Sequence, residues 1–297
     1  MSEMFCYQCE QTAGGTACTK RGVCGKDDEV EALQDNLVQA CKGISMYAHR
    51  ARELGAKDEQ VDSFVQDAYF ATLTNTNFDP ERFVDLLHEA GRIKDRARDL
   101  YEQACREAGQ SPLTLSGPAA WEPADGVDAL IKQGKQLSIE NRMDTYGEDV
   151  TGVQELSVDG LKGAAAYAHH ARVLCMTSEE VDAGFHRLTN EVAGEPKDLN
   201  ELLGLALDVG KFNYKVMELL DAANTGAYGN PEPSEARVEP VKGKAIVVSG
   251  HDLKDLKNLL EQTKGKGINV YTHGEMLPAH GYPELKQYDH LVGNYGG

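Results

Sequence analysis

Apolar residues recur every three or four positions along most of the chain, which predicts amphipathic helices. The first such pattern begins after Asp27-Asp28 and runs to Leu54. Residues 1–30, in contrast, show no sustained period and are rich in Gly, Thr and Cys. Further helical stretches are predicted at 61–75, 80–106, 179–192 and 198–222. The pattern predicts a cysteine-rich N-terminal segment followed by a largely helical domain.

Part of the helical pattern occurs twice. Residues 42–54 match residues 162–174 at an offset of 120, with eight of thirteen positions identical. Each copy is followed by two more helical stretches, and a Pro- and Gly-rich loop around 112–126 joins the copies. One amphipathic helix cannot bury its apolar face alone, whereas three helices together can. We therefore predict a helical domain made of two duplicated three-helix bundles. Its limits are 31–225, with bundles at about 31–108 and 151–223.

The pattern changes after a second Pro- and Gly-rich linker at 224–242. Residues 244–250 form a short β-branched run typical of a buried parallel strand, and 268–272 form another. A helical pattern at 251–263 separates them. Strand, helix and strand at these lengths make a βαβ unit with a parallel sheet. Because two strands make a poor sheet, residues 241–297 are predicted to be the first part of a Rossmann-like parallel α/β domain that is cut short. The expected fold class is multidomain α plus α/β.

Composition and charge narrow the function classes. The chain has 297 residues and a net charge of −18. Such an acidic chain is a poor ligand for nucleic acid or anionic membranes, because phosphate binding needs a basic surface that releases counterions. The charge suits docking to a basic redox protein, although it also serves solubility alone. No apolar run approaches the about 18–20 residues of a membrane span, and Met1–Cys6 shows no export signal. The chain is expected to be cytoplasmic.

Four of the seven cysteines fall within nineteen positions, with x2, x8 and x5 spacing: Cys6, Cys9, Cys18 and Cys24. In a chain without an export signal, such crowding favours metal ligation over disulfides. A Cys-x2-Cys turn can hold one metal centre, and two further thiolates complete a tetrahedral set. Zinc and an iron–sulfur cubane both accept four thiolates, so the spacing leaves both open, with unliganded or disulfide-linked cysteines as a third alternative. Three other cysteines lie in helical patterns and are predicted to be buried: Cys41, Cys105 and Cys175.

A second candidate site lies in the predicted α/β part. His251 follows the first strand directly, and Glu275 lies three residues beyond the second. Parallel strands place their carboxyl ends at the same edge of a sheet, so these two side chains are expected to be neighbours. An imidazole and a carboxylate together suit iron or another transition metal. In the alternative interpretation, His251 only caps the following helix and Glu275 is a solvated loop residue.

Six short stretches carry a resemblance to a known family. They are Met4–Thr12, Gly22–Lys26, Leu219–Thr225 with Tyr228–Pro231, Ser249–Asp255, Tyr271–Pro278 and Val292–Gly297. In this order they resemble the hybrid cluster protein family, whose members are also called prismane proteins or hydroxylamine reductases. The resemblance runs from about residue 4 to the last residue.

The resemblance implies ligands for two metal centres. Cys6, Cys9, Cys18 and Cys24 correspond to the ligands of a [4Fe–4S] cluster. His251 and Glu275 correspond to two ligands of a hybrid [4Fe–2O–2S] cluster. The family's remaining hybrid-cluster ligands, several cysteines and another glutamate, belong to a C-terminal half that this chain does not contain. The chain is therefore expected to be a fragment, a shortened protein or one piece of a split enzyme.

The family's activity implies an oxidoreductase that reduces hydroxylamine to ammonia and water with two electrons, at the hybrid cluster fed by the [4Fe–4S] cluster. Nitric oxide reduction and a peroxide or nitrosative-stress activity on the same centre are alternatives. Two others are an electron-transfer module carrying only the [4Fe–4S] cluster and a zinc-stabilised interaction protein. The implied partners are a small nitrogen substrate, a redox protein as electron donor and a C-terminal half supplied as a separate chain. No catalytic side chain is assigned.

Overall fold

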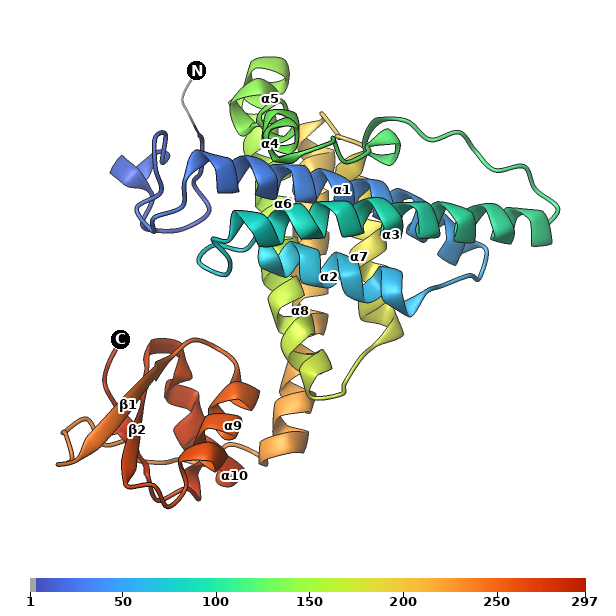
Figure 1. Cartoon of the computed structure of the whole chain (residues 1–297). Coiled ribbons are helices and arrows are strands. Elements are labelled where there is room, and N and C mark those ends of the chain that lie inside the picture. The colour runs from blue at the N-terminus through green and yellow to red at the C-terminus, as the bar shows by residue number, and fades with distance from the viewer. Residues whose placement is uncertain (1–3) are drawn as a thin grey trace. The chain divides into compact units, whose positions relative to one another are not determined.

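The computed structural model describes residues 4–297, which are mainly helical and include one small sheet (Figure 1). Residues 1–3 of the predicted 1–30 segment lie outside the described residues. Contacts divide the chain into two compact units. The first comprises Met1–His169 and Ser178–Val216, and the second comprises His170–Thr177 and Met217–Gly297. Most of the long helices belong to the first unit, and the sheet belongs to the second.

The duplicated three-helix unit is present. The first copy consists of α1 (Asp28–Glu53), α2 (Glu59–Ala71) and α3 (Pro80–Glu107), and the second of α6 (Glu148–Val173), α7 (Glu179–Ala193) and α8 (Leu199–Tyr228). Both ends of α1 and α6 differ by 120 residues, as do the first residues of α2 and α7. This confirms the predicted duplication. The predicted domain limits remain predictions, because the two compact units divide the chain within α6 and α8.

The central helix of the first unit is α1. It packs against α2 and α3 of its own copy and against α7 of the other (Figure 1). Leu33, Leu37 and Ile44 on α1 are completely buried. Their spacing of four and seven residues places them on one face of the helix, as the sequence period predicts.

The two copies contact each other through matching polar residues on α2 and α7. His186 Nε2 on α7 lies 2.8 Å from Asp62 Oδ1 on α2, and its Nδ1 lies 3.1 Å from the hydroxyl of Ser45. Gln66 Nε2 on α2 donates to Asp182 Oδ1 on α7 at 2.7 Å. Positions 62 and 66 correspond to 182 and 186 at the offset of 120. The two contacts are therefore repeat-related counterparts, as expected of a pseudo-two-fold interface.

The connection between the copies is more ordered than the predicted loop. Short helices occur at η2 (Gly117–Ala120), α4 (Val127–Lys135) and α5 (Ile139–Tyr146). The sequence pattern missed them because elements of four, nine and eight residues hold too few apolar positions to show a period. Trp121 anchors the connection, since its indole N–H donates to Asn36 Oδ1 at 2.7 Å.

Helix α4 approaches α1 most closely at Gly134, where an added Cβ would lie 1.8 Å from the carbonyl oxygen of Ala32. Gly134→Ala is expected to lower the free energy of unfolding by about 1–3 kcal/mol through this clash. The effect should appear despite the usual preference of a helix for Ala over Gly of about 1 kcal/mol. Urea unfolding followed by circular dichroism measures it.

Gly204→Ala is the matched control for Gly134→Ala. Gly204 is also helical, but among residues 4–297 its added Cβ would meet no heavy atom within 4 Å beyond its chain neighbours and the nearby backbone of its own helix. The control is expected to leave stability unchanged or to raise it slightly. Equal unfolding curves for the two variants would contradict the close contact between α4 and α1.

The second unit holds a parallel sheet. Its strands β1 (Lys244–Ser249), β2 (Ile268–His273) and β3 (Leu291–Asn294) lie in the order β1-β2-β3, and both neighbouring pairs are parallel. Helix α9 (Leu253–Thr263) connects β1 to β2, which confirms the predicted βαβ unit. The segment after β2 contains η3 (Gly274–Gly281) and α10 (Pro283–Lys286). Strand β3 was not predicted, because four residues are too few for a recognisable alternation.

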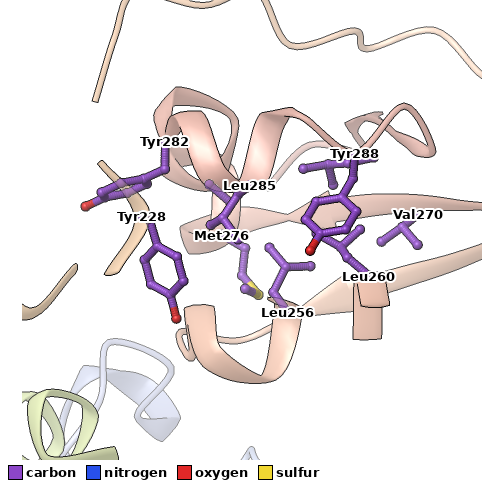
Figure 2. Packing of buried hydrophobic residues seen from close by; sticks show 10 residues of the cluster. Tyr228, Leu256, Leu260, Val270, Met276, Tyr282, Leu285 and Tyr288 are labelled. Atoms are coloured by element: carbon purple, nitrogen blue, oxygen red, sulfur yellow. The ribbon is translucent and has the colours of Figure 1, made fainter. Parts of the chain in front are cut away.

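One face of this sheet is covered by an apolar cluster (Figure 2). Leu256 and Leu260 of α9 pack with Val270 of β2, Met276 of η3 and Leu285 of α10, all at 2% exposure or less. The prediction that β1 is buried is wrong. As an edge strand it has a mostly exposed or half-exposed burial pattern, and its Val247 is 52% exposed. The β-branched run correctly indicated a strand but not its position in the sheet.

None of the helices within residues 4–297 combines the length and the apolar character that a membrane span requires.

Candidate metal centres

The cysteine segment, residues 4–26, is held together by backbone hydrogen bonds between two short stretches. The N–H of Cys6 donates to the carbonyl of Cys18 at 3.2 Å, and the N–H of Cys18 donates to the carbonyl of Cys6 at 2.8 Å. Beside this isolated bridge, the N–H of Met4 donates to the carbonyl of Thr19 at 3.3 Å. Two of the predicted ligands, Cys6 and Cys18, are therefore directly opposite each other although twelve positions separate them.

The other two predicted ligands lie in turns. The carbonyl of Cys9 accepts hydrogen bonds from the N–H of Thr12 at 3.2 Å and from its hydroxyl at 2.6 Å. Cys24 lies in a turn closed by the N–H of Gly22, which donates to the carbonyl of Lys26 at 2.7 Å. Cys9 is half-buried and Cys24 is exposed. Both ligands therefore lie in turns, outside the bridge that joins Cys6 to Cys18.

A buried lysine ties this segment to α1. The ammonium of Lys26 lies 2.7 Å from Glu31 Oε2 and donates to Gln34 Oε1 at 3.1 Å. Burial raises the pKa of the Cys6 thiol, the Glu31 carboxylate adds to this rise, and Lys26 opposes it. Lys26 is not predictable from the sequence, because a lone lysine in a loop has no pattern that distinguishes it from a surface residue.

The cysteine segment has the donor chemistry of a cluster site, but its thiols are not gathered. Within the part of the chain that the structure describes, no three Cys, His, Asp or Glu side chains lie close enough to hold a metal ion. One amide is already directed at sulfur, since the N–H of Ala13 lies 3.5 Å from Cys18 Sγ. Hydrogen bonds to sulfur are typical of iron–sulfur sites. Because metal binding deprotonates and draws together its thiols, four cysteines in one segment fit such a group, and their ligand role stays a prediction.

The second candidate site is at the carboxyl edge of the sheet. His251 follows β1, Glu275 follows β2, and His251 Nε2 contacts Glu275 Oε2 directly. Both side chains are exposed, at 61% and 74%. The sequence prediction that the two residues are neighbours is thus met by the geometry. A nitrogen and a carboxylate oxygen at the surface fit two ligands of an iron centre, and their ligand role stays a prediction.

Neighbouring residues hold the loop that carries His251. Asp252 accepts hydrogen bonds from the N–H groups of Lys254 at 2.7 Å and Asp255 at 3.2 Å, and so caps α9. A hydrogen bond from His170, together with these backbone bonds, lowers the pKa of Asp252 below its usual range even though burial opposes the shift. The role of His170 is not predictable from the sequence, because nothing in a single sequence links it to a residue 82 positions away.

The three remaining cysteines lie outside these sites. Cys41 and Cys105 are buried, as predicted. Cys175 is exposed instead, because α6 ends at Val173 and Cys175 has a left-handed backbone with φ of 63°. The sequence pattern predicts a helix that includes Cys175, but α6 ends two residues earlier, at Val173.

Comparisons with known proteins place similar sequences in one family. Hydroxylamine reductases of Rhodospirillum rubrum, Acidithiobacillus ferrooxidans and Yersinia pseudotuberculosis are 54%, 52% and 48% identical to this chain. Each alignment covers 99% of this chain and 54% of the relative, so the chain spans about half the length of these relatives. A solved structure of acetyl-CoA synthase/carbon monoxide dehydrogenase is 12% identical, with a TM-score of 0.30, and covers 96% of this chain and 39% of its own. That likeness is too weak to carry an argument.

The sequence model of the Prismane/CO dehydrogenase family matches residues 4–297, which include the cysteine segment, both helical copies and the sheet. The chain belongs to the Prismane/CO dehydrogenase family.

Proposed function

We propose that this chain carries the cluster-binding half of an iron–sulfur oxidoreductase that reduces hydroxylamine. The reaction is NH2OH + 2 e⁻ + 2 H⁺ → NH3 + H2O, in which the N–O bond breaks and both products take up protons. The observation that carries the proposal is the similarity over 99% of the chain to proteins named hydroxylamine reductase, at 48–54% identity. The donor sets of both candidate sites support it.

Each donor set has a proposed role. The thiolates of Cys6, Cys9, Cys18 and Cys24 would hold a [4Fe–4S] cluster. The Nε2 atom of His251 and the carboxylate of Glu275 would be two ligands of a hybrid [4Fe–2O–2S] cluster. Bound clusters would supply the two electrons. To bind iron through Nε2, the imidazole of His251 must carry no proton on that nitrogen. The nitrogen must also give up its present contact with Glu275.

Further ligands and partners belong to the same proposal. The hybrid cluster needs ligands from outside residues 4–297, either from a continuation of the polypeptide or from a separate chain. The electron donor would be a redox protein with a basic surface, which the net charge of −18 favours. We also propose a cytoplasmic location, where cysteine ligands are kept reduced.

Iron content and product formation test the proposed function together. The protein is purified anaerobically together with the polypeptide that supplies the remaining hybrid-cluster ligands. Its iron is counted, and ammonia is measured after adding hydroxylamine and a reduced viologen. About eight irons per chain, with one ammonia per two electrons, are expected if both centres assemble. About four irons without ammonia would identify an electron-transfer module and contradict the reductase. Colourless protein that contains zinc would contradict both.

His251→Ala is expected to separate the two centres. In protein that holds both, the variant should lose about half of its iron, while the absorption of the cysteine-held cluster remains. Hydroxylamine reduction should fall by more than about 100-fold, because removing a ligand costs more than the about 10–100-fold typical of residues behind the ligands. Iron analysis and ammonia yield measure the two effects.

His273→Ala is the matched control for His251→Ala. His273 also lies at the carboxyl edge of the sheet, where its Nδ1 is 2.9 Å from the hydroxyl of Ser249, but it lies outside the proposed ligand set. Its replacement should leave the iron content unchanged. Equal iron loss in both variants would argue against His251 as a specific ligand.

A further inference from the structure

A polar cavity of about 230 Å³ lies inside the helical unit. Helices α1, α5 and α6 line most of it, and Glu195, which follows α7, completes the wall. The lining is more polar than apolar and contains residues of both charges. Nothing in the proposed hydroxylamine chemistry uses this cavity.

The duplication builds the cavity from both copies. Three positions on α1 have their repeat-related counterparts on α6, at the offset of 120, lining the same space. The pairs are Asp35 with Glu155, Val38 with Val158, and Lys42 with Lys162. Spacings of three, four and seven residues place each set on one helix face. The cavity therefore contains two equivalent lysines, one from each copy.

These two lysines are buried with little direct ion pairing. Lys42 is 6% exposed and Lys162 is 4% exposed. Among residues 4–297, Lys42 has no ion pair within 4.0 Å, and Lys162 has only Asp159 at 3.9 Å. Burying an ammonium without a partner is strongly unfavourable, so such groups normally have a counter-ion. Both lysines instead line the cavity.

The acidic residues around the cavity supply that counter-charge only in part: Glu155, Glu195 and Asp35 raise the pKa of Lys42, but burial and the charge of Arg142 outweigh them. Arg142 on α5 forms an ion pair with Glu155, and the Tyr146 hydroxyl donates to Glu195 at 2.5 Å. Burial raises the pKa of Asp35 well above its usual range, and the Glu31 and Glu155 carboxylates add to the rise. A protonated Asp35 would be a hydrogen-bond donor and no longer a counter-charge.

We infer that this cavity binds a small oxyanion held between the ammonium groups of Lys42 and Lys162. The volume is below the about 300–1,000 Å³ of ordinary ligand pockets, which selects an anion of a few non-hydrogen atoms. Carboxylates, nitrogen oxyanions and phosphate share the required chemistry, two or more oxygens that accept hydrogen bonds. The neutral side chain of Gln39 also lines the cavity and can donate to such an anion.

Anion binding should be accompanied by proton uptake. Burial, followed by the charge of Arg142, lowers the pKa of Lys42 to about 8. An anion beside Lys42 favours its charged form, so the pKa of this lysine rises on binding and protons are taken up near pH 8. The other ionisable groups facing the cavity are Asp35, Arg142, Tyr146, Glu155, Lys162 and Glu195.

Isothermal titration calorimetry of the full chain tests the inference without requiring iron. Acetate, nitrite and phosphate are titrated separately at matched ionic strength, with chloride as the reference salt. At least one oxyanion is expected to bind saturably at one site, and its apparent binding heat near pH 8 should depend on the buffer because protons are taken up. The oxyanion that binds shows whether the natural ligand is a carboxylate, a nitrogen oxyanion or phosphate. Absence of saturable binding for all three would overturn the inference.

Charge-removing variants locate the binding site. Lys42→Gln and Lys162→Gln should each weaken binding about tenfold or more, because a hydrogen bond to a charged group is lost. Lys211→Gln is the control, since Lys211 is 78% exposed on α8 and does not line the cavity. Circular dichroism establishes that each variant is folded, and Lys42→Arg, which keeps the charge, should still bind. Unchanged affinity in folded Lys42→Gln or Lys162→Gln protein would overturn the inference.

Discussion

Cys9→Ser is expected to remove most of the iron from the cysteine segment and with it the brown colour of anaerobically purified protein. Serine keeps the size of the side chain but replaces a soft thiolate with a hydroxyl that binds iron poorly. The remaining three cysteines cannot supply the fourth thiolate that a [4Fe–4S] cluster takes from the protein. Iron per chain and the visible spectrum measure the loss.

The same variant should also loosen the segment that carries Cys9. Few residues there are regular. The backbone bonds belong to the bridge between Cys6 and Cys18, to several turns and to the three-residue η1 (Ala13–Gly15). Metal binding provides ordering energy that such a segment lacks, so its removal should increase hydrogen exchange in residues 4–26. Helix α1 should be affected less, because its Leu33 and Leu37 are completely buried.

Cys175→Ser is the matched control for Cys9→Ser. Cys175 is also a free cysteine, it is exposed, and it lies outside residues 4–26. Its replacement should leave iron content, colour and hydrogen exchange of the cysteine segment unchanged. Full iron content in Cys9→Ser protein would show that the ligand assignment is wrong.

Much of the fold could be predicted because the signals were local or repeated. The identity between residues 42–54 and 162–174 gave the duplication, and helices α1 and α6 keep the offset of 120 at both ends. Short elements such as α4 and β3 gave no signal, because they depend on packing against distant residues. The position of β1 at the sheet edge is likewise set by the order of the strands and not by its own composition.

The candidate sites were predicted to different degrees. The meeting of His251 and Glu275 follows from a general property of parallel sheets, so two short strands were enough to anticipate it. Cys6 opposite Cys18 could not be anticipated, because a backbone bridge between two irregular stretches has no period. The cavity holding Lys42 and Lys162 needed the structure as well, since a repeat predicts equivalent residues but not that they face the same space.

Asp62→Ala is expected to lower the free energy of unfolding by about 3–5 kcal/mol, the usual cost of breaking a buried ion pair from one side. The carboxylate forms an ion pair with Arg52 at 2.5 Å and lies 2.8 Å from His186, which is completely buried. Its removal leaves His186 Nε2 without its acceptor in a low-dielectric interior, and leaves Arg52 with the carboxylate of Glu179 alone. Urea unfolding of wild type and variant at neutral pH measures the difference.

The duplication supplies the matched control, because Asp182 is the repeat-related counterpart of Asp62. Gln66 donates to Asp182 at 2.7 Å, so Asp182→Ala removes a hydrogen bond from a neutral amide. The free energy of unfolding should therefore fall by only about 1–3 kcal/mol. Equal costs for the two variants would show that the charges around Asp62 add nothing to the interface between the copies.

The pH dependence distinguishes lost charge from lost packing at position 62. Burial alone would raise the pKa of Asp62, but hydrogen bonds and charge from His186 and Arg52 outweigh it and hold the pKa below its ordinary 3.8. A lowered carboxyl pKa contributes stability that is complete above pH 3.8 and is lost as the pH falls through the lower value of the folded protein. The difference between wild type and Asp62→Ala should therefore shrink below about pH 4. A difference that stays constant down to pH 2 would mean that Asp62 stabilises the two copies by filling space, and the ion pair between α1 and α2 would then have no electrostatic role.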